Sequence, residues 1–193
     1  MAPGPMFALT LAKSYESPWA GIWVSLGHAV VEVPLVLLIY FGFAEFFKRR
    51  WTQFVLSIVG AGMIMWLGIA MFNARLDVVQ QGKDLPYSAF VAGILTSALN
   101  PFFLLWWATV GSMLIMRFVA FGRASLSLFV IVHWLCDLLW LSFVSVLVYN
   151  TRSFWAQRFQ EGLFIASSLL LVGFGVWFAI AGVRTWFGKR QLG

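Results

Sequence analysis

The sequence predicts an all-α, polytopic membrane protein, and two observations carry this prediction. Apolar residues make up 62% of the 193 residues and charged residues only 10%, whereas soluble domains average roughly 45–50% and about 25%. Residues 54–72, 87–116 and 162–183 contain no charge, and crossing the hydrocarbon core takes about 20 apolar helical residues. A transmembrane barrel would need shorter segments that alternate polar and apolar residues. That pattern is absent from the sequence, so helices are the expected spanning structure.

The apolar stretches divide the chain into about six transmembrane helices, the first of them incomplete. We expect complete spans at residues 19–46, 53–73, 87–116, 124–149 and 161–187, and polar loops at residues 15–18 and 73–86. Residues 1–12 would form only about 18 Å of helix at 1.5 Å per residue. We therefore expect either that the protein starts upstream of Met1 or that residues 1–12 form a re-entrant half-helix. All 193 residues are assigned to one transmembrane domain.

The positions of lysine and arginine predict the orientation. One side of the membrane receives Lys48, Arg49, Arg50, Arg117, Arg123, Arg184, Lys189 and Arg190. The other side receives Lys13, Arg75, Lys83, Arg152 and Arg158. Because cytoplasmic loops carry an excess of these residues, we expect the first side and the C-terminus to be cytoplasmic. We expect the membrane to be the plasma or inner membrane of a prokaryote. The net charge of +6 then suits anionic lipid headgroups and gives no reason to expect a nucleic-acid partner.

Two classes of chemistry are disfavoured by what the sequence lacks. Cys136 is the only cysteine, so an internal disulfide and a relay of paired thiols are both excluded. No nucleophile occurs with a base at a recognisable spacing. We therefore expect a transporter that needs no cofactor, and we do not expect an enzyme.

A helix-breaking motif occurs at a corresponding place in each half of the chain, as Pro3-Gly4-Pro5 and as Asn100-Pro101. Proline removes a backbone donor, and within a membrane this is tolerated where the backbone lines a cavity or another helix. A half-helix beginning after Pro101 would present free N–H groups beside Asn100, a suitable place for a carboxylate. A simple proline kink is the structural alternative.

Each half also contains a histidine one helical turn before an acid, His28 before Glu32 and His133 before Asp137. Residues at this spacing share one face of a helix. An acid near mid-bilayer costs roughly 2.5–3.5 kcal/mol, and such groups are functional by default. We expect Glu32 and Asp137 to be protonatable carboxylates on a polar path. The histidines could relay protons, bind a metal with the acids, hold a haem between them or act only as structural partners.

The order of these features, break before His–acid pair, predicts two inverted three-helix repeats at about residues 1–73 and 87–187, as in many secondary transporters. With these residues in view, the chain resembles the lysine-exporter (LysE-type) family of amino-acid exporters over nearly its whole length. The resemblance is carried by Pro3-Gly4-Pro5-x-Phe7, Ala20-Gly21, Gly27-His28 with its acid, Phe90-x2-Gly93, Leu99-Asn100-Pro101, and His133 to Asp137 followed by Leu138-Leu139-Trp140.

The resemblance implies a six-helix exporter that moves small amino acids or similar solutes outward, driven by a proton or cation gradient. It also implies that the Pro-Gly-Pro and Asn-Pro positions form helix breaks at the site, with Asp137 as a coupling or substrate residue. We expect alternating access, an amino-acid-like substrate and a surrounding lipid bilayer, with a homo-oligomer left open. Two alternatives stand beside it: a divalent metal-ion exporter with His28, Glu32, His133 and Asp137 as ligands, and a redox protein holding haem between the histidines.

Overall fold

The computed structural model describes residues 5–81, 84–155 and 157–187, and all regular structure within them is helical. The described residues contain five helices that are long and apolar enough to cross a membrane. These candidate spans are Ala20–Tyr40, Arg50–Asp77, Pro101–Ala120, Ala124–Phe154 and Gln157–Phe187, and a shorter apolar helix covers Ala89–Ala98. The predicted all-α, polytopic membrane fold is confirmed.

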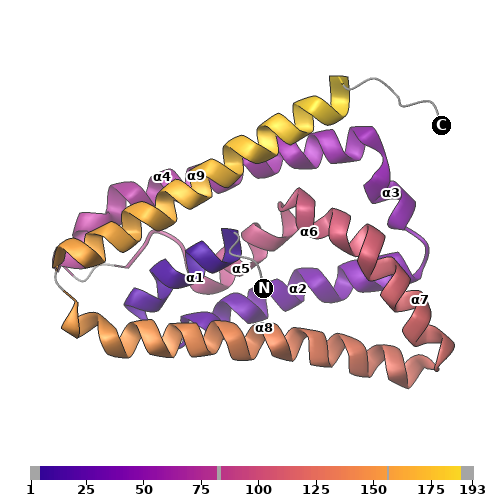
Figure 1. Ribbon diagram of the computed structural model, residues 1–193, viewed down its shortest axis with the longest axis horizontal. Helices are drawn as coiled ribbons and strands as arrows, with labels where there is room; N and C mark the ends of the chain where they lie inside the picture. The colour runs from indigo at the N-terminus through magenta and orange to yellow at the C-terminus, as the bar shows by residue number, and fades with distance from the viewer. Residues whose placement is uncertain (1–4, 82–83, 156, 188–193) are drawn as a thin grey trace.

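Long helices form the two edges of the molecule and short ones lie between them (Figure 1). The elements are α1 (Pro5–Glu16), α2 (Ala20–Tyr40), α3 (Ala44–Lys48), α4 (Arg50–Gln81), α5 (Ala89–Ala98), α6 (Pro101–Trp106), the π-helical turn η1 (Trp107–Gly111), α7 (Ser112–Ala120), α8 (Arg123–Thr151), η2 (Arg152–Phe154) and α9 (Gln157–Phe187). Helices α4 and α9 pack together along one edge and α8 runs along the other, with α1, α2 and α5 between them.

Two of the expected boundaries are wrong. Residues 73–81 were expected to be part of a loop, yet they form the last turns of α4. Polar residues there are compatible with a helix that continues beyond the apolar core, because polarity alone does not end a helix. The first complete span was expected to reach residue 46, but α2 ends at Tyr40 and Gly42 follows with a φ of 94°. Glycine adopts this left-handed conformation without strain, so the chain turns there before α3.

The expected span at residues 87–116 is divided at the Asn100-Pro101 motif. Helix α5 ends at Ala98, and α6 begins at Pro101 with Asn100 as its N-cap. Proline is favoured at the first position of a helix because that position needs no backbone donor. The break predicted from the sequence is therefore present, and it joins two separate helices in the middle of the chain.

Helix α1 is a short helix held inside the protein. Ala8, Leu9 and Ala12 are completely buried, and so are the polar residues Thr10 and Ser14. The helix packs against α2, α5, α8 and α9, so it contributes to the interior of the bundle along its whole length. Of the Pro-Gly-Pro motif, Pro5 is the first residue of α1, whereas Pro3 and Gly4 lie outside the described residues.

Helices α2 and α5 approach each other closely through a reciprocal pair of glycines. A Cβ atom on Gly27 would collide with the Phe90 carbonyl of α5, and one on Gly93 would collide with the Val24 carbonyl of α2. Small residues permit this backbone contact between membrane helices. The crossing sets the distance between α2 and α5 where His28, the residue after Gly27, meets Ser97 of α5.

Corresponding helices of the two predicted repeats contact each other, although α1 also contacts α8 and α2 also contacts α5. Helix α1 contacts α5, α2 contacts α8, and α4 contacts α9. A pseudo-two-fold axis between two three-helix units would generate such pairs. The inverted relation between the two units stays a prediction.

Candidate functional site

The four ionisable residues singled out in the sequence converge on one place between α2 and α8. Helix α2 supplies His28 and Glu32, and α8 supplies His133 and Asp137. Glu32 is completely buried, His28 and Asp137 are 3% and 8% exposed, and the His133 side chain is partly exposed. Both helices are candidate membrane spans. We call these four residues the His–acid cluster.

The contacts in the His–acid cluster run across the two helices. The Nε2 atom of His133 lies 3.1 Å from Oε1 of Glu32, and Nε2 of His28 lies 3.5 Å from Oδ2 of Asp137. His28 also lies 3.6 Å from Oε2 of Glu32 within α2. Pairing is therefore not confined to each acid and the histidine one turn before it. Each histidine contacts the acid of the opposite helix, which joins the two pairs into one unit.

Glu32 depends on the two imidazoles for its charge compensation. Both of its carboxylate oxygens are buried, and no ordinary hydrogen bond reaches them from the described residues. The nearest partners are the Nε2 atoms of His28 and His133. A buried carboxylate without such partners would be strongly disfavoured. The cluster can thus redistribute protons between imidazoles and carboxylates without leaving one charge isolated.

Ser97 of α5 orients the His28 ring. The Nδ1 atom of His28 lies 2.8 Å from the Ser97 hydroxyl oxygen, and that hydroxyl donates to the Gly93 carbonyl at 2.7 Å. Because the serine proton is used in this way, the hydroxyl oxygen is left to accept from an Nδ1–H of His28. The Nε2 atom then faces the two carboxylates, either carrying a proton or receiving one from a protonated acid.

Aromatic rings enclose the histidines. Phe103 of α6 meets the His28 ring edge-on at 5.0 Å between centroids. Trp106 lies nearly parallel to His133 at 5.9 Å, and Trp107 meets it edge-on at 5.3 Å. These rings place apolar surface against the two imidazoles, and a lower local dielectric strengthens the interactions among the charges of the cluster.

The tryptophans are placed by an irregular turn. Residues Trp107–Gly111 form the π-helical turn η1, and Trp107 is completely buried with an indole N–H that has no partner among the described residues. A Cβ atom on Gly111 would collide with the Trp107 ring, so glycine makes room for it. Single π-helical turns occur often at functional sites, and this one is adjacent to His133.

The Asn100-Pro101 break contributes in a different way from the one expected. The Asn100 side-chain oxygen accepts hydrogen bonds from the N–H groups of Phe102 and Phe103, at 3.1 and 3.2 Å. These donors, which we expected to be free for a substrate carboxylate, are occupied by Asn100 in this conformation. The break lies against Gly60 of α4, and it directs α6 so that Phe103 reaches His28.

The geometry separates the two alternative functions. Potential ligand atoms of His28, Glu32 and Asp137 lie within 4.8 Å of one another, so this part of the cluster could receive a divalent cation as cargo. A haem needs its two histidines on opposite faces of the porphyrin. Here both imidazoles contact the carboxylate of Glu32, and Glu32 occupies the space that a porphyrin would need. The geometry therefore gives no support to the haem alternative.

Comparison with known proteins identifies the family. A family model described as "LysE type translocator" matches residues 1–182. The chain belongs to the LysE-type translocators. The resemblance inferred from the sequence motifs is thereby confirmed, and the family is one of transporters.

A curated relative of this LysE-type chain comes from Bacillus subtilis (strain 168) and is named "Putative amino acid efflux protein YcgF". It is 25% identical over 191 residues, which cover 96% of this chain and 91% of the relative. No solved structure gives a significant match. Family and relative both support the class of exporter, whereas the roles of individual residues must be argued from the geometry.

Sequence reasoning missed two side chains that shape this site, Ser97 and Phe103, and it gave Trp107 no definite role. Ser97 carries no signal of its own because a serine one turn after a glycine is common in membrane helices. Trp107 could be seen to fall within a span, but the π-helical turn that buries it has no recognisable sequence pattern. Knowing that α2 packs on α5 would have been enough to find Ser97.

Proposed function

We propose that this LysE-type protein is a secondary exporter of amino acids or related small solutes, and that the His–acid cluster carries the coupling protons. The observation that carries the proposal is the crossed pairing, His28 with Asp137 and His133 with Glu32. The family match and the name of the bacterial relative support the class of cargo.

The crossed pairs connect helices of the two predicted repeats. In alternating access, one repeat moves relative to the other around a central site. Protonation of Glu32 or Asp137 removes a negative charge and weakens its attraction to a protonated histidine of the opposite helix. Helices α2 and α8 could then separate on one side of the membrane. Loss of the proton restores the pair and favours the closed arrangement.

The break at Asn100 and Pro101 would serve as the hinge of α6 in this cycle. Movement at the break would shift Phe103 on His28 and, through η1, the tryptophans beside His133. We propose the same role for the Pro3-Gly4-Pro5 motif of the other predicted repeat, in which Pro5 is the first residue of α1. A substrate carboxylate could approach the N–H groups of α6 only if the Asn100 cap were released.

The test is export of labelled amino acids from preloaded cells. Cells expressing the protein should lose one class of amino acid faster than cells with an empty vector. Asp137→Asn should slow this efflux at least about tenfold, equivalent to roughly 1.4 kcal/mol, because the amide cannot exchange a proton with His28. Glu45→Gln, at an exposed acid of α3, is the matched control and should export normally. Unchanged efflux in Asp137→Asn, with the protein present in the membrane, would remove Asp137 from the mechanism.

A second candidate function, export of a divalent metal ion, is favoured by the three-residue ligand group of His28, Glu32 and Asp137. Under that function, expression should protect cells against one of Mn²⁺, Co²⁺, Ni²⁺ or Zn²⁺. The protection should disappear in Asp137→Asn and persist in Glu45→Gln. Amino-acid efflux without any metal protection would reject the metal function.

A further inference from the structure

An open cavity of about 650 Å³ lies at the end of α1, away from the His–acid cluster. Helix α1 supplies Lys13 and Glu16 to its wall, the start of α2 supplies Trp23, and the segment of residues 84–89 closes the other side. Ligand pockets for small molecules usually have volumes of about 300–1,000 Å³. We call this the Lys13 cavity.

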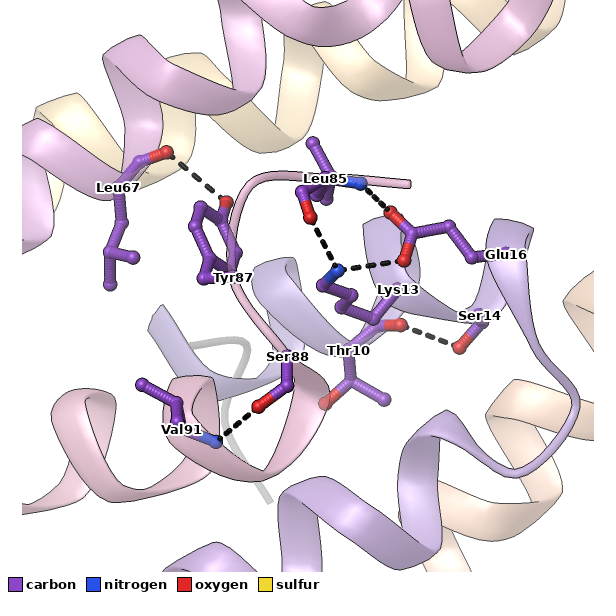
Figure 2. Close-up of polar contacts among 9 residues, drawn as sticks. All are labelled: Thr10, Lys13, Ser14, Glu16, Leu67, Leu85, Tyr87, Ser88 and Val91. Carbon is purple, nitrogen blue, oxygen red and sulfur yellow. Dashed lines mark hydrogen bonds and ion pairs between the residues drawn. The ribbon is translucent and has the colours of Figure 1, made fainter. Parts of the chain in front are cut away.

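The wall of the Lys13 cavity contains a buried ion pair (Figure 2). Nζ of Lys13 lies 2.7 Å from Oε2 of Glu16, and the two side chains are only 4% and 9% exposed. The same two side chains hold Leu85: Lys13 donates to its carbonyl at 3.4 Å, and Glu16 accepts from its N–H at 2.7 Å. Burial raises the pKa of the Glu16 carboxyl, whereas the hydrogen bond from Lys13 lowers it. Burying two charges only to fasten a loop is costly.

Other groups in the cavity wall complete a site for a small ion with charges of both signs. The Tyr87 ring lies 5.2 Å from Nζ of Lys13, and its hydroxyl donates to the Leu67 carbonyl at 3.3 Å. Asp84 and Trp23 are exposed and line the cavity. The wall therefore offers an ammonium group, two carboxylates and aromatic faces to which a cation can bind.

The Lys13 cavity and the His–acid cluster lie along the same two helices. Ala20 of α2 and Ala89 of α5 line the cavity, whereas His28 and Ser97 lie further along these helices, about 12 Å away at 1.5 Å per residue. The close crossing of α2 and α5 keeps the two helices together over this distance.

Buried hydroxyls occur on α1, α2 and α8, the helices that carry Lys13 and the His–acid cluster. Ser14 of α1 and Ser145 of α8 form a hydrogen bond at 2.8 Å. The hydroxyls of Ser25 and Ser142 are buried and have no partner among the described residues. Unsatisfied buried polar groups call for a specific explanation, such as water or a ligand. Among them, Ser25 lies on α2 between Ala20 of the cavity wall and His28 of the cluster.

We propose that the Lys13 cavity is a second binding site for the exported zwitterion, the place from which it leaves the protein. The proposal rests on the proposed function, an exporter of amino-acid-like solutes. The solute's carboxylate would contact the ammonium of Lys13, and its own ammonium would contact the carboxylate of Glu16. Binding thus replaces the ion pair between Lys13 and Glu16 by two ion pairs with the solute. The hydrogen bonds of Lys13 and Glu16 with the Leu85 backbone are then released.

This exchange requires both charges on one small molecule. A lone carboxylate would pair with Lys13 but leave the buried Glu16 carboxylate without a cationic partner. A lone amine would pair with Glu16 but leave the buried Lys13 ammonium without an anionic partner. An unpaired buried charge is strongly disfavoured. The cavity should therefore bind α-amino acids and reject acetate and methylammonium.

The proposal can be tested by binding measurements on the purified full chain with Asp137→Asn in every sample, so that binding at the His–acid cluster is impaired. The probes are labelled L-alanine, L-leucine, L-lysine and L-glutamate, with acetate and methylammonium as competitors. Lys13→Gln and Glu16→Gln test the cavity. Lys48→Gln is the matched control because Lys48 and Glu45 form another Lys–Glu pair of the same spacing and 2.7 Å distance, but exposed and on α3.

We expect Lys13→Gln and Glu16→Gln to weaken binding of at least one amino acid tenfold or more, Lys48→Gln to have no effect, and neither single-charge competitor to displace the label. Equal binding in all three variants, displacement by acetate, or no binding at all would overturn the proposal. If Lys13→Gln or Glu16→Gln fails to fold, Lys13→Arg or Glu16→Asp replaces it. Each of these keeps the charge and should bind the amino acid more tightly than the neutral variant at the other residue of the ion pair. Failure of the proposed function is distinguishable, because it would appear as efflux from cells that does not depend on Asp137.

Discussion

Glu32 is the residue on which the His–acid cluster depends, because both histidines contact its carboxylate. The sequence was sufficient to single out Glu32, since a carboxyl group in an apolar span is uncommon and functional by default. Its partner on α8 could not be predicted. The contact between Glu32 and His133 is 3.1 Å, but it depends on how α2 faces α8, and the spacing of residues along one helix does not contain that information.

Replacement of Glu32 by alanine should destabilise the protein more than replacement of any exposed acid. Glu32→Ala leaves the imidazoles of His28 and His133 without their shared partner, and breaking a buried pair typically costs about 3–5 kcal/mol. Glu45→Ala, which removes an exposed carboxylate of α3, should change stability by less than about 1 kcal/mol. Unfolding of the purified variants in mixed micelles would measure the difference, and equal stabilities would contradict the central place given to Glu32.

The crossing of α2 and α5 is the contact between elements that positions the site. It brings Ser97 to the Nδ1 atom of His28. Because α2 and α5 also line the Lys13 cavity, the same pair of helices connects the cavity with the cluster. The motifs Gly27-His28 and Phe90-x2-Gly93 could be recognised in the sequence. The sequence did not indicate that each of these glycines lies against the other helix. The turns at residues 73–81 were missed for a related reason, because a loss of apolar character marks the limit of the apolar core and does not mark the end of a helix.

A methyl group at the crossing should separate α2 from α5. In Gly27→Ala the new Cβ would collide with the Phe90 carbonyl, and overpacking of this kind typically costs about 1–3 kcal/mol. Gly62→Ala is the matched control, because a Cβ atom there meets nothing within 4 Å and alanine is favoured over glycine in a helix by roughly 0.5–1 kcal/mol. We expect Gly27→Ala to lower the unfolding temperature and slow efflux. A Gly27→Ala protein as stable and as active as Gly62→Ala would show that the close approach is dispensable.

At the scale of the whole molecule, the sequence predicted the class of fold and the family, and both are confirmed. Composition and the lengths of the apolar stretches were enough to predict a helical membrane protein, because neither depends on contacts between helices. The inverted relation of the repeats and the orientation are still predictions. They depend on modest signals, namely the positions of two breaks and the distribution of basic residues.

The orientation predicts which ends of the helices can be labelled from outside the cell. With Cys136 replaced by serine, a cysteine at Phe154, which is 87% exposed in η2 just after α8, should react with a membrane-impermeant maleimide in intact cells. A cysteine at Glu45 in α3 should react only after permeabilisation, because that side carries more lysine and arginine. The reverse labelling pattern would mean that the positive-inside assignment is wrong and that the C-terminus is outside.

The most direct test of the coupling role is proton movement during export by the purified protein in liposomes. Vesicles containing a pH-sensitive dye and a labelled amino acid would be prepared with the unmodified protein, with Asp137→Asn and with Glu45→Gln. If the His–acid cluster carries the coupling protons, the unmodified protein and Glu45→Gln will move protons inward as the amino acid leaves, and an imposed proton gradient will accelerate efflux. Asp137→Asn will do neither. Amino-acid efflux that proceeds at the same rate with and without the gradient, or proton movement that persists in Asp137→Asn, would contradict the account.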